Sequence, residues 1–410
     1  MSTNTLGAAN GYLQRLLLSF AIPAYRWLWL NSVFGSMRVI TIFVARGWLV
    51  LTLTDSPFWV GAAPALRGVA QILVGSFAGV MLDRVNRRTA LLIVEVGNSL
   101  IAAGLGWLIL SGQIKMWHIL VAAVLEGLLI SVRWPAINIM IVNVVGRERM
   151  LNASAAQMLG FNLGNVLSSA IAGLIIASSG IEDAYFFGAA CGLIAAFSVC
   201  FVKGEFRPEV VQEPIIRALR EGIAYIGQHR ILLWLIVLGF LMSLLGWANL
   251  TMLPVMARDV LGQDASGLGF LTGAGALGSL ISTLLIAGLG DYKNKMRLVL
   301  WSGVATAIAI VLFAASSWFP LSLLLSAVMQ AVLMAFEVSL TASVLLLTAD
   351  KMQGRVQGIY TQVFGFTWVG GVVLGSIAEF LGAPIAIALG GLCIGGVVAF
   401  VWRPLQRMDM

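Results

Sequence analysis

Long apolar runs recur along this chain and decide which folds are open to it. Hydrophobic residues make up 60% of the sequence and charged residues only 10%, whereas soluble domains carry about 25% charged residues. A helix of about 20 apolar residues crosses the hydrocarbon of a bilayer. The sequence therefore predicts an all-α membrane protein with twelve transmembrane helices, at about 27–53, 58–82, 89–110, 117–143, 153–179, 184–202, 231–256, 267–289, 297–316, 319–347, 356–381 and 383–402.

Lysine and arginine are distributed unevenly among the connections between these runs. One set of connections holds all but two of those that lie outside the spans, and the exceptions are Lys115 and Arg258. Cytoplasmic loops of membrane proteins carry such an excess of positive charge. We therefore expect both termini in the cytoplasm and a multi-pass protein of a bacterial-type cytoplasmic (inner) membrane. The net charge of +7 has the same cause, so no nucleic-acid partner is expected.

The two halves of the chain are similar to each other. Residues 157–161 read Gln-Met-Leu-Gly-Phe, and residues 362–366 repeat this half a chain later as Gln-Val-Phe-Gly-Phe. An even number of predicted spans separates the two copies, which indicates a parallel repeat about an axis along the membrane normal. We therefore predict two pseudo-symmetric six-helix bundles, residues 1–202 and 231–410, joined by a cytoplasmic linker, residues 203–230.

The linker is predicted to contain a helix that lies on the membrane surface. From Pro214 onward, apolar and charged residues alternate with helical spacing. The apolar face would carry Ile215, Leu219, Ile223 and Ile226, and the opposite face Arg217, Arg220 and Glu221. Such a pattern is typical of an amphipathic helix in the interface plane, and a solvated linker helix with no regulatory role is the simpler interpretation.

One short connection, Gly79–Arg88, is more charged than a turn between two membrane helices needs. It contains one acid and three bases, namely Asp83, Arg84, Arg87 and Arg88. The stretch resembles the pattern G-x-x-x-D-R-x-x-R-R between helices 2 and 3 of the major facilitator superfamily. This resemblance implies the major facilitator fold and a gating role for the four charged residues. A weaker copy in the second half places Asp291 in the same role, whereas topology alone would also explain Arg87 and Arg88.

Two further stretches narrow the resemblance. The step Trp134–Ala136 is followed by Val145–Ala153, and the turn after the first span is Leu53–Pro57. These stretches resemble the drug/proton antiporter branch that includes macrolide-efflux proteins and the enterobactin exporter. The resemblance implies a secondary active transporter, a proton-coupled exporter of a small amphipathic or anionic compound such as a siderophore or a drug-like molecule.

Several ionisable residues fall inside the predicted spans, where a charge costs about 2.5–3.5 kcal/mol on insertion scales. They are Arg38, Arg46, Arg67, Glu95, Glu126, Arg133 and Glu337. From the helical rise of about 1.5 Å per residue, Arg46, Arg67 and Glu126 are predicted to share one depth, and Arg133 and Glu337 another. Structural pairing explains Arg46, Arg67 and Glu95 as well as a functional role does. It also remains the alternative for Glu126, Arg133 and Glu337.

The resemblance also assigns roles to four of these charges, because spans one, four, seven and ten line the central cavity of that superfamily. Arg38 and Arg133 are predicted to bind an anionic group of the substrate. Glu126 and Glu337 are predicted to carry the coupling proton, since burial favours a protonated carboxyl group and a nearby arginine favours the ionised one. Three tryptophans deep in their spans are predicted to stack on a planar ligand or, alternatively, to pack the core: Trp134, Trp247 and Trp368.

Other functions remain open at this point. An importer of an organic anion would suit the arginines inside the spans equally well. A membrane enzyme or lipid-handling protein would need a catalytic set that is not seen, and a receptor without transport activity would not need the charged turn. The sequence has no G-x-x-x-x-G-K-[ST] motif, so ATP drive is not expected. We expect a monomer without metal, cofactor or enzymatic activity, whose partners are a small-molecule substrate, protons and the lipid bilayer.

Overall fold

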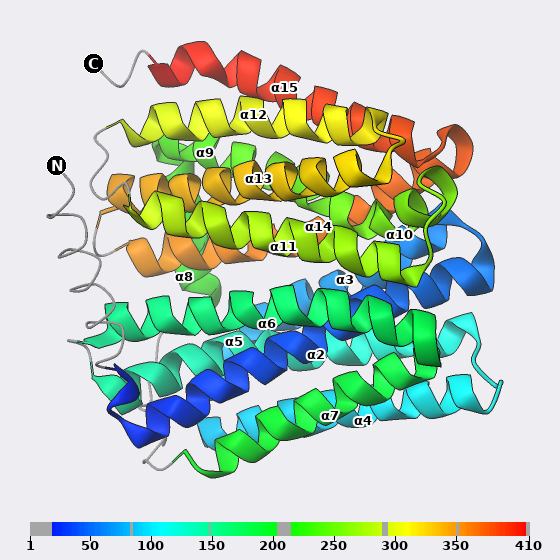
Figure 1. The fold of residues 1–410 in the computed structure, drawn as a ribbon. Coiled ribbons are helices and arrows are strands. Elements are labelled where there is room, and N and C mark those ends of the chain that lie inside the picture. Colours follow the sequence, from blue (N-terminus) through cyan, green and yellow to red (C-terminus); the bar gives the residue numbers. More distant parts are fainter. Residues whose placement is uncertain are drawn as a thin grey trace, which may run out of the picture.

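The computed structural model describes residues 19–82, 85–146, 149–202, 215–288, 294–349 and 352–406. Within these ranges the chain forms helices joined by short turns and contains no strand. Figure 1 shows the long helices running side by side in two groups, with the first half of the chain below and the second half above.

Six membrane-length helices form the first group. They are α2 (Pro23–Thr54), α3 (Pro57–Leu82), α4 (Arg87–Leu110), α5 (Met116–Val145), α6 (Met150–Ser179) and α7 (Ile181–Cys200). Proline opens both α2 and α3, where its missing N–H would have had no helical partner. The side chain of Asn86 accepts hydrogen bonds from the Arg88 and Thr89 amides and so caps α4.

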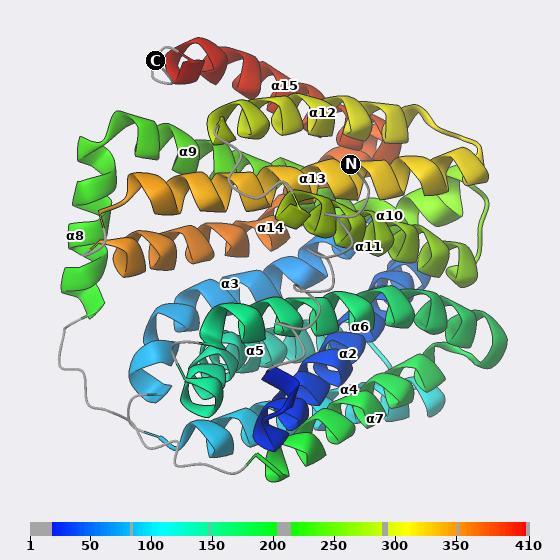
Figure 2. The same ribbon diagram turned by 60° about the vertical axis from the view of Figure 1, so that its left-hand side comes forward.

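The second group also has six helices of membrane length. They are the rod Arg230–Val260, which begins with α9 (Arg230–Leu241), and then α11 (Ala265–Gly288), α12 (Lys295–Ala315), α13 (Phe319–Leu347), α14 (Gln353–Leu381) and α15 (Ala383–Gln406). The predicted linker helix corresponds to α8 (Ile215–Gln228). Figure 2 shows α8 lying across the ends of α9, α13 and α14, as a helix on a membrane surface would.

The prediction of an all-α protein with twelve spans is confirmed. Twelve helices of the described chain are long and apolar enough to cross a membrane, and their ends differ from the predicted boundaries by at most four residues. The apolar runs were sufficient to predict the spans, because lipid offers no hydrogen-bond partners and a helix satisfies all the backbone hydrogen bonds within its own segment.

The seventh span is irregular, which the apolar pattern did not predict. After α9 it continues as a π-helical segment, η2 (Met242–Gly246), and a 3₁₀-helical segment, η3 (Trp247–Met252). The short α10 (Leu253–Val255) and a second π-helical segment, η4 (Met256–Val260), complete it. Pro254 lies in α10, where it has no N–H to donate and its ring crowds the preceding turn. Such irregular turns inside a helix often accompany functional positions, and Trp247 opens η3.

Small residues bring the two groups of helices into close contact. α3 packs against α14, and α6 packs against α11. A methyl group at Gly61 would overlap the backbone carbonyl group of Gly371, and one at Gly173 would lie 2.7 Å from the Cα of Gly269. Small residues at these positions let helix backbones approach in lipid, so the two halves meet along two tight seams.

The two ends of the helix bundle differ in what they carry. We call them the linker end, where α2 begins, α8 lies and α15 ends, and the far end, which holds the α2–α3 and α14–α15 turns (Figures 1 and 2). The ion pair between Arg258 and Asp55, which joins the two halves, lies at the far end.

Candidate functional site

A first group of buried charges is centred on Glu95 of α4. Arg133 Nε of α5 donates to Glu95 Oε1 at 2.7 Å, and Arg38 Nη2 of α2 lies 3.5 Å from Glu95 Oε2. Asn31 Nδ2 donates to Glu95 Oε1 at 3.3 Å and to the Ala195 carbonyl oxygen at 3.0 Å. This network ties α2, α4, α5 and α7 together, so both arginines predicted to bind substrate share one carboxylate.

A second group lies closer to the far end. Arg46 Nη2 of α2 lies 2.5 Å from both carboxylate oxygens of Glu126 on α5. Arg67 of α3 is 9% exposed and makes no ion pair within the described ranges. Its charge acts on Glu126 without direct contact. The common depth predicted for these three residues is consistent with this cluster.

Positive charge exceeds negative charge in the interior of the first half. Its buried side chains between the helix ends include four arginines, Arg38, Arg46, Arg67 and Arg133, but only two acids, Glu95 and Glu126. Among the described residues, the interior of this half therefore carries two more basic than acidic side chains. A buried charge without a partner is costly.

The second half holds one carboxyl group at comparable depth, Glu337 of α13. The Tyr360 hydroxyl group of α14 donates a hydrogen bond to Glu337 Oε1, and the Trp247 indole of η3 interacts with the same carboxyl group. Within the described ranges no arginine or lysine pairs with Glu337, and Arg133, predicted at the same depth, pairs with Glu95 instead. Glu337 thus has neutral neighbours only.

The three tryptophans predicted to stack on a ligand have different surroundings. Trp247 is buried against Glu337. Trp134 packs edge-on against Phe161 and lies beside Arg133, with the guanidinium carbon 5.6 Å from its ring centroid. Trp368 of α14 lies beside Phe43 of α2, with ring centroids 5.9 Å apart. Only Trp368 brings an aromatic face from the second half against the charges of the first.

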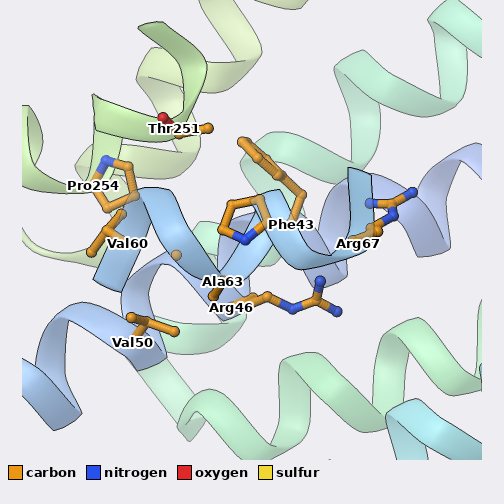
Figure 3. Close-up of a pocket in the computed structure, with 10 residues that line it drawn as sticks. Phe43, Arg46, Val50, Val60, Ala63, Arg67, Thr251 and Pro254 are labelled. Atoms are coloured by element: carbon orange, nitrogen blue, oxygen red, sulfur yellow. The ribbon is translucent and has the colours of Figure 1, made fainter. Parts of the chain in front are cut away.

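A small cavity lies between the halves at this point. Phe43, Arg46 and Arg67 of the first half face Thr251 and Pro254 of the irregular seventh span, around a volume of about 20 Å³. One water-sized probe needs about 10–15 Å³, so the cavity takes only a small group. Figure 3 shows the guanidinium groups of Arg46 and Arg67 at the same side of the cavity.

The predicted gating residues are only partly placed. Asp83, Arg84 and Asp291 lie outside the described residues. Arg88 donates to the carbonyl oxygens of Val199, at 3.2 Å, and of Cys200. These carbonyls end α7, where the helix dipole favours a cation. Arg88 thus closes a contact inside the first half, and Arg87 is buried beside it.

A clamp between the halves, which sequence reasoning missed, surrounds the α2–α3 turn. Arg258 of η4 contacts Asp55 through Nη2 at 2.5 Å and the Leu51 carbonyl oxygen through Nη1 at 3.3 Å. Glu379 of α14 accepts hydrogen bonds from Ser56 Oγ at 2.8 Å and from the Phe58 amide at 3.1 Å. A cation thus caps the end of α2 and an anion caps the start of α3.

The sequence offered a signal for this clamp. Arg258 is one of only two basic residues expected at the far end, so its position was already exceptional. Its partner Asp55 belongs to the turn Leu53–Pro57 that carries part of the resemblance to known transporters. What the pattern lacked was the packing of α14 on α3, which brings Glu379 to the same turn.

No group of three or more His, Cys, Asp and Glu residues is placed to hold a metal ion in the described part of the chain. The three cysteines are free, with Cys191 buried and Cys200 and Cys393 exposed. The chemistry that the described residues bring together is therefore that of ion pairs, hydrogen bonds and a single carboxyl group with neutral neighbours.

Comparisons with known proteins give the family. A model of the transmembrane secretion effector family matches residues 17–410. The enterobactin exporter EntS of Escherichia coli O81 (strain ED1a) is 25% identical over 407 residues, which cover 97% of this chain and 96% of that protein.

Solved structures share the fold. The crystal structure of the nucleoside transporter NupG has a TM-score of 0.74 at 14% identity and covers 93% of this chain and 99% of its own. A bacterial homologue of the human lysosomal transporter Spinster, in an inward-facing and occupied conformation, has a TM-score of 0.69 at 12% identity, with coverage of 93% and 94%. At such identities the likeness establishes the fold alone. Because the family model matches almost the whole length of this chain, the chain belongs to the transmembrane secretion effector family of the major facilitator superfamily.

Proposed function

We propose that this protein is a proton-coupled exporter of a small amphipathic or anionic compound. It works as a monomer in the cytoplasmic (inner) membrane, with both termini and the linker end in the cytoplasm. Alternating access, in which the two six-helix halves rock about a central site, moves the cargo outward.

The arrangement of contacts between the halves supports alternating access. The clamp at the α2–α3 turn joins the two halves at the far end through the Arg258–Asp55 ion pair and the hydrogen bonds to Glu379. A partly exposed contact that joins the halves at one end can break and form again, which is what a two-state element needs. We take the far end as the outer side, because the basic connections expected in the cytoplasm lie at the linker end.

The single observation that carries the proton coupling is the environment of Glu337. Among the described residues, the contacts of this carboxyl group are a tyrosine hydroxyl and an indole. It can therefore gain or lose a proton without breaking an ion pair to any of them. Its protonation changes the charge of the interior by one, which biases the two arrangements of the halves. Glu126 is the second proton carrier, and it must first leave Arg46.

The remaining roles follow the family. Asp83, Arg84, Arg87, Arg88 and Asp291 form the cytoplasmic gate. Arg38 and Arg133, with Trp134, Trp247 and Trp368, line the path of an anionic, partly planar cargo. The relatives described as enterobactin exporters support a siderophore as that cargo.

The test is transport by the purified protein in liposomes. Enterobactin and a panel of amphipathic anions are offered to liposomes with an imposed pH gradient of either sign. We expect uptake into vesicles with an acidic interior in which the linker end of the protein faces the medium. A protonophore should abolish that uptake. Accumulation that ignores the gradient contradicts proton coupling.

An importer of an organic anion is the second candidate, because the excess of buried arginine suits either direction. The same liposomes separate the two functions. An importer accumulates its substrate only when the far end faces the medium, whereas the exporter requires the linker end to do so.

A further inference from the structure

One buried arginine is left over by the pairs described above. Arg67 Nε is buried and has no hydrogen-bond partner in the part of the chain that the structure describes, and its side chain contacts no carboxylate there. Glu126 acts on it only through space, since both Glu126 oxygens are held by Arg46. A guanidinium buried in this way calls for an anion.

Arg67 lies where the two halves meet. Its guanidinium carbon is 5.3 Å from the ring centroid of Trp368, which belongs to α14 of the other half. Gly68 makes this approach possible, because a methyl group there would lie 2.6 Å from Trp368 Cβ. A guanidinium group over an aromatic face keeps its N–H groups for a second, in-plane partner.

The second partner has a place to enter. Arg46 and Arg67 both line the interface cavity, together with Phe43 (Figure 3). The Nε atoms of both arginines are buried without a hydrogen-bond partner. The volume of about 20 Å³ suits a group of few atoms such as a planar oxyanion, which a guanidinium group binds through parallel hydrogen bonds.

We infer that Arg67 and Arg46 form the binding site for a carboxylate group of the cargo, with Trp368 and Phe43 against the apolar part next to it. The inference rests on the proposed function and differs from it in the residues that bind the anionic group of the cargo. The anionic group is bound chiefly by Arg67, which has no ion pair among the described residues, whereas Arg46 pairs with Glu126 and contributes its charge beside it. Arg38 and Arg133 already share Glu95.

The site also gives the cargo a hold on both halves. Arg46 and Arg67 belong to the first half and Trp368 to the second, so a bound carboxylate contacts groups that separate when the halves rock apart. A ligand with different contacts in two arrangements shifts the balance between them. The alternative is that the contact between Arg67 and Trp368 only packs α3 against α14, in which case no anion binds there.

Ligand-induced stabilisation of the purified full-length protein in detergent tests the site. The probes are benzoate and benzamide, which have the same shape but differ in charge. Benzoate is expected to raise the unfolding temperature of the wild-type protein, and benzamide is not. Equal stabilisation by both probes, or none by benzoate, overturns the inference.

Variants locate the binding. Arg67→Gln is expected to raise the dissociation constant for benzoate about tenfold to a hundredfold, as the loss of one charged hydrogen-bonding group does, and Trp368→Leu raises it by a smaller factor. Arg297→Gln, which removes the same charge from an exposed position of α12, leaves the constant unchanged. An unchanged dissociation constant in Arg67→Gln refutes the site. If Arg67→Gln does not fold, the comparison of the two probes in Trp368→Leu decides instead.

The outcome is separate from that of the transport experiment, since binding is measured without a pH gradient. A protein that binds benzoate through Arg67 but shows no gradient-driven transport keeps the site and loses the proposed function. A protein that shows gradient-driven transport but does not bind benzoate keeps the proposed function and loses the site.

Discussion

The two halves of the molecule hold their buried carboxyl groups in different ways. In the first half, Glu95 and Glu126 lie 2.7 Å and 2.5 Å from arginine nitrogens. In the second half, Glu337 has a hydroxyl group and an indole as neighbours. An ion pair must be broken before its carboxylate accepts a proton, whereas a carboxyl group with neutral neighbours avoids that cost.

This difference separates two tasks within one repeated architecture. The first half fixes its charges in a network that joins helices, and its surplus arginine is left to face an anion. The second half has the carboxyl group that is free to change its charge. A parallel repeat of helices therefore does not imply that equivalent positions do equivalent work.

The largest effect expected is on stability, in Glu95→Gln. This change leaves Arg38 and Arg133 without their shared anion, and breaking such a buried network costs about 3–5 kcal/mol. Glu337→Gln removes no ion pair and is expected to cost about 1 kcal/mol or less. Thermal unfolding of the purified variants in detergent gives the comparison, and equal losses of stability would erase the distinction between the halves.

A smaller effect is expected from Tyr360→Phe, which removes one neutral hydrogen bond to Glu337, worth about 0.5–1.5 kcal/mol. Tyr25→Phe is a matched control in the first half, because the Tyr25 hydroxyl group donates to the Ala153 carbonyl oxygen at 2.6 Å. Both variants should lose similar stability, but only Tyr360→Phe should change the pH profile of transport. A changed profile in Tyr25→Phe alone would reverse the assignment.

The smallest effect expected concerns the clamp that joins the halves. Arg258 and Asp55 are partly solvent-exposed, with side chains 29% and 82% exposed, and such pairs contribute about 0.2–1 kcal/mol. Arg258→Gln should therefore shift the population toward a far end that is open, without unfolding the protein.

Distances between spin labels measure that shift. Labels at Gln113 and Ser317, on far-end turns of the two halves, should show a larger share of long distances in Arg258→Gln than in the wild type. Lys115→Gln, which removes the other basic residue of the far end, should leave the distribution unchanged. A distribution unaltered by Arg258→Gln would mean that the clamp holds nothing.

The sequence was sufficient for the spans but not for the pairs. Apolar runs predict helices because lipid leaves the backbone no other partner, and the depths of Arg46 and Glu126 could be counted along their helices. Depth alone does not give the rotation of a helix about its axis. The count therefore gave Arg133 and Glu337 a common depth but could not show that Arg133 pairs with Glu95.

The irregular seventh span was missed for a related reason. The sequence stays largely apolar through residues 242–257, and a change from α-helical to π-helical or 3₁₀-helical turns leaves no trace in hydropathy. Pro254 was the only local signal. Tyr360 and Glu379 were likewise unpredictable as partners, because α14 reaches Glu337 and the α2–α3 turn only through the packing of whole helices.

Glu337, with its neutral neighbours, is proposed as the main link between transport and protons, and the paired Glu126 as a weaker one. The most direct test of this proposal compares Glu337→Gln with Glu126→Gln in liposomes, by transport with a pH gradient and by exchange of substrate without one. The account predicts that Glu337→Gln keeps the exchange and loses the acceleration by the gradient, whereas Glu126→Gln keeps part of it. Full gradient-driven transport in Glu337→Gln would contradict the claim.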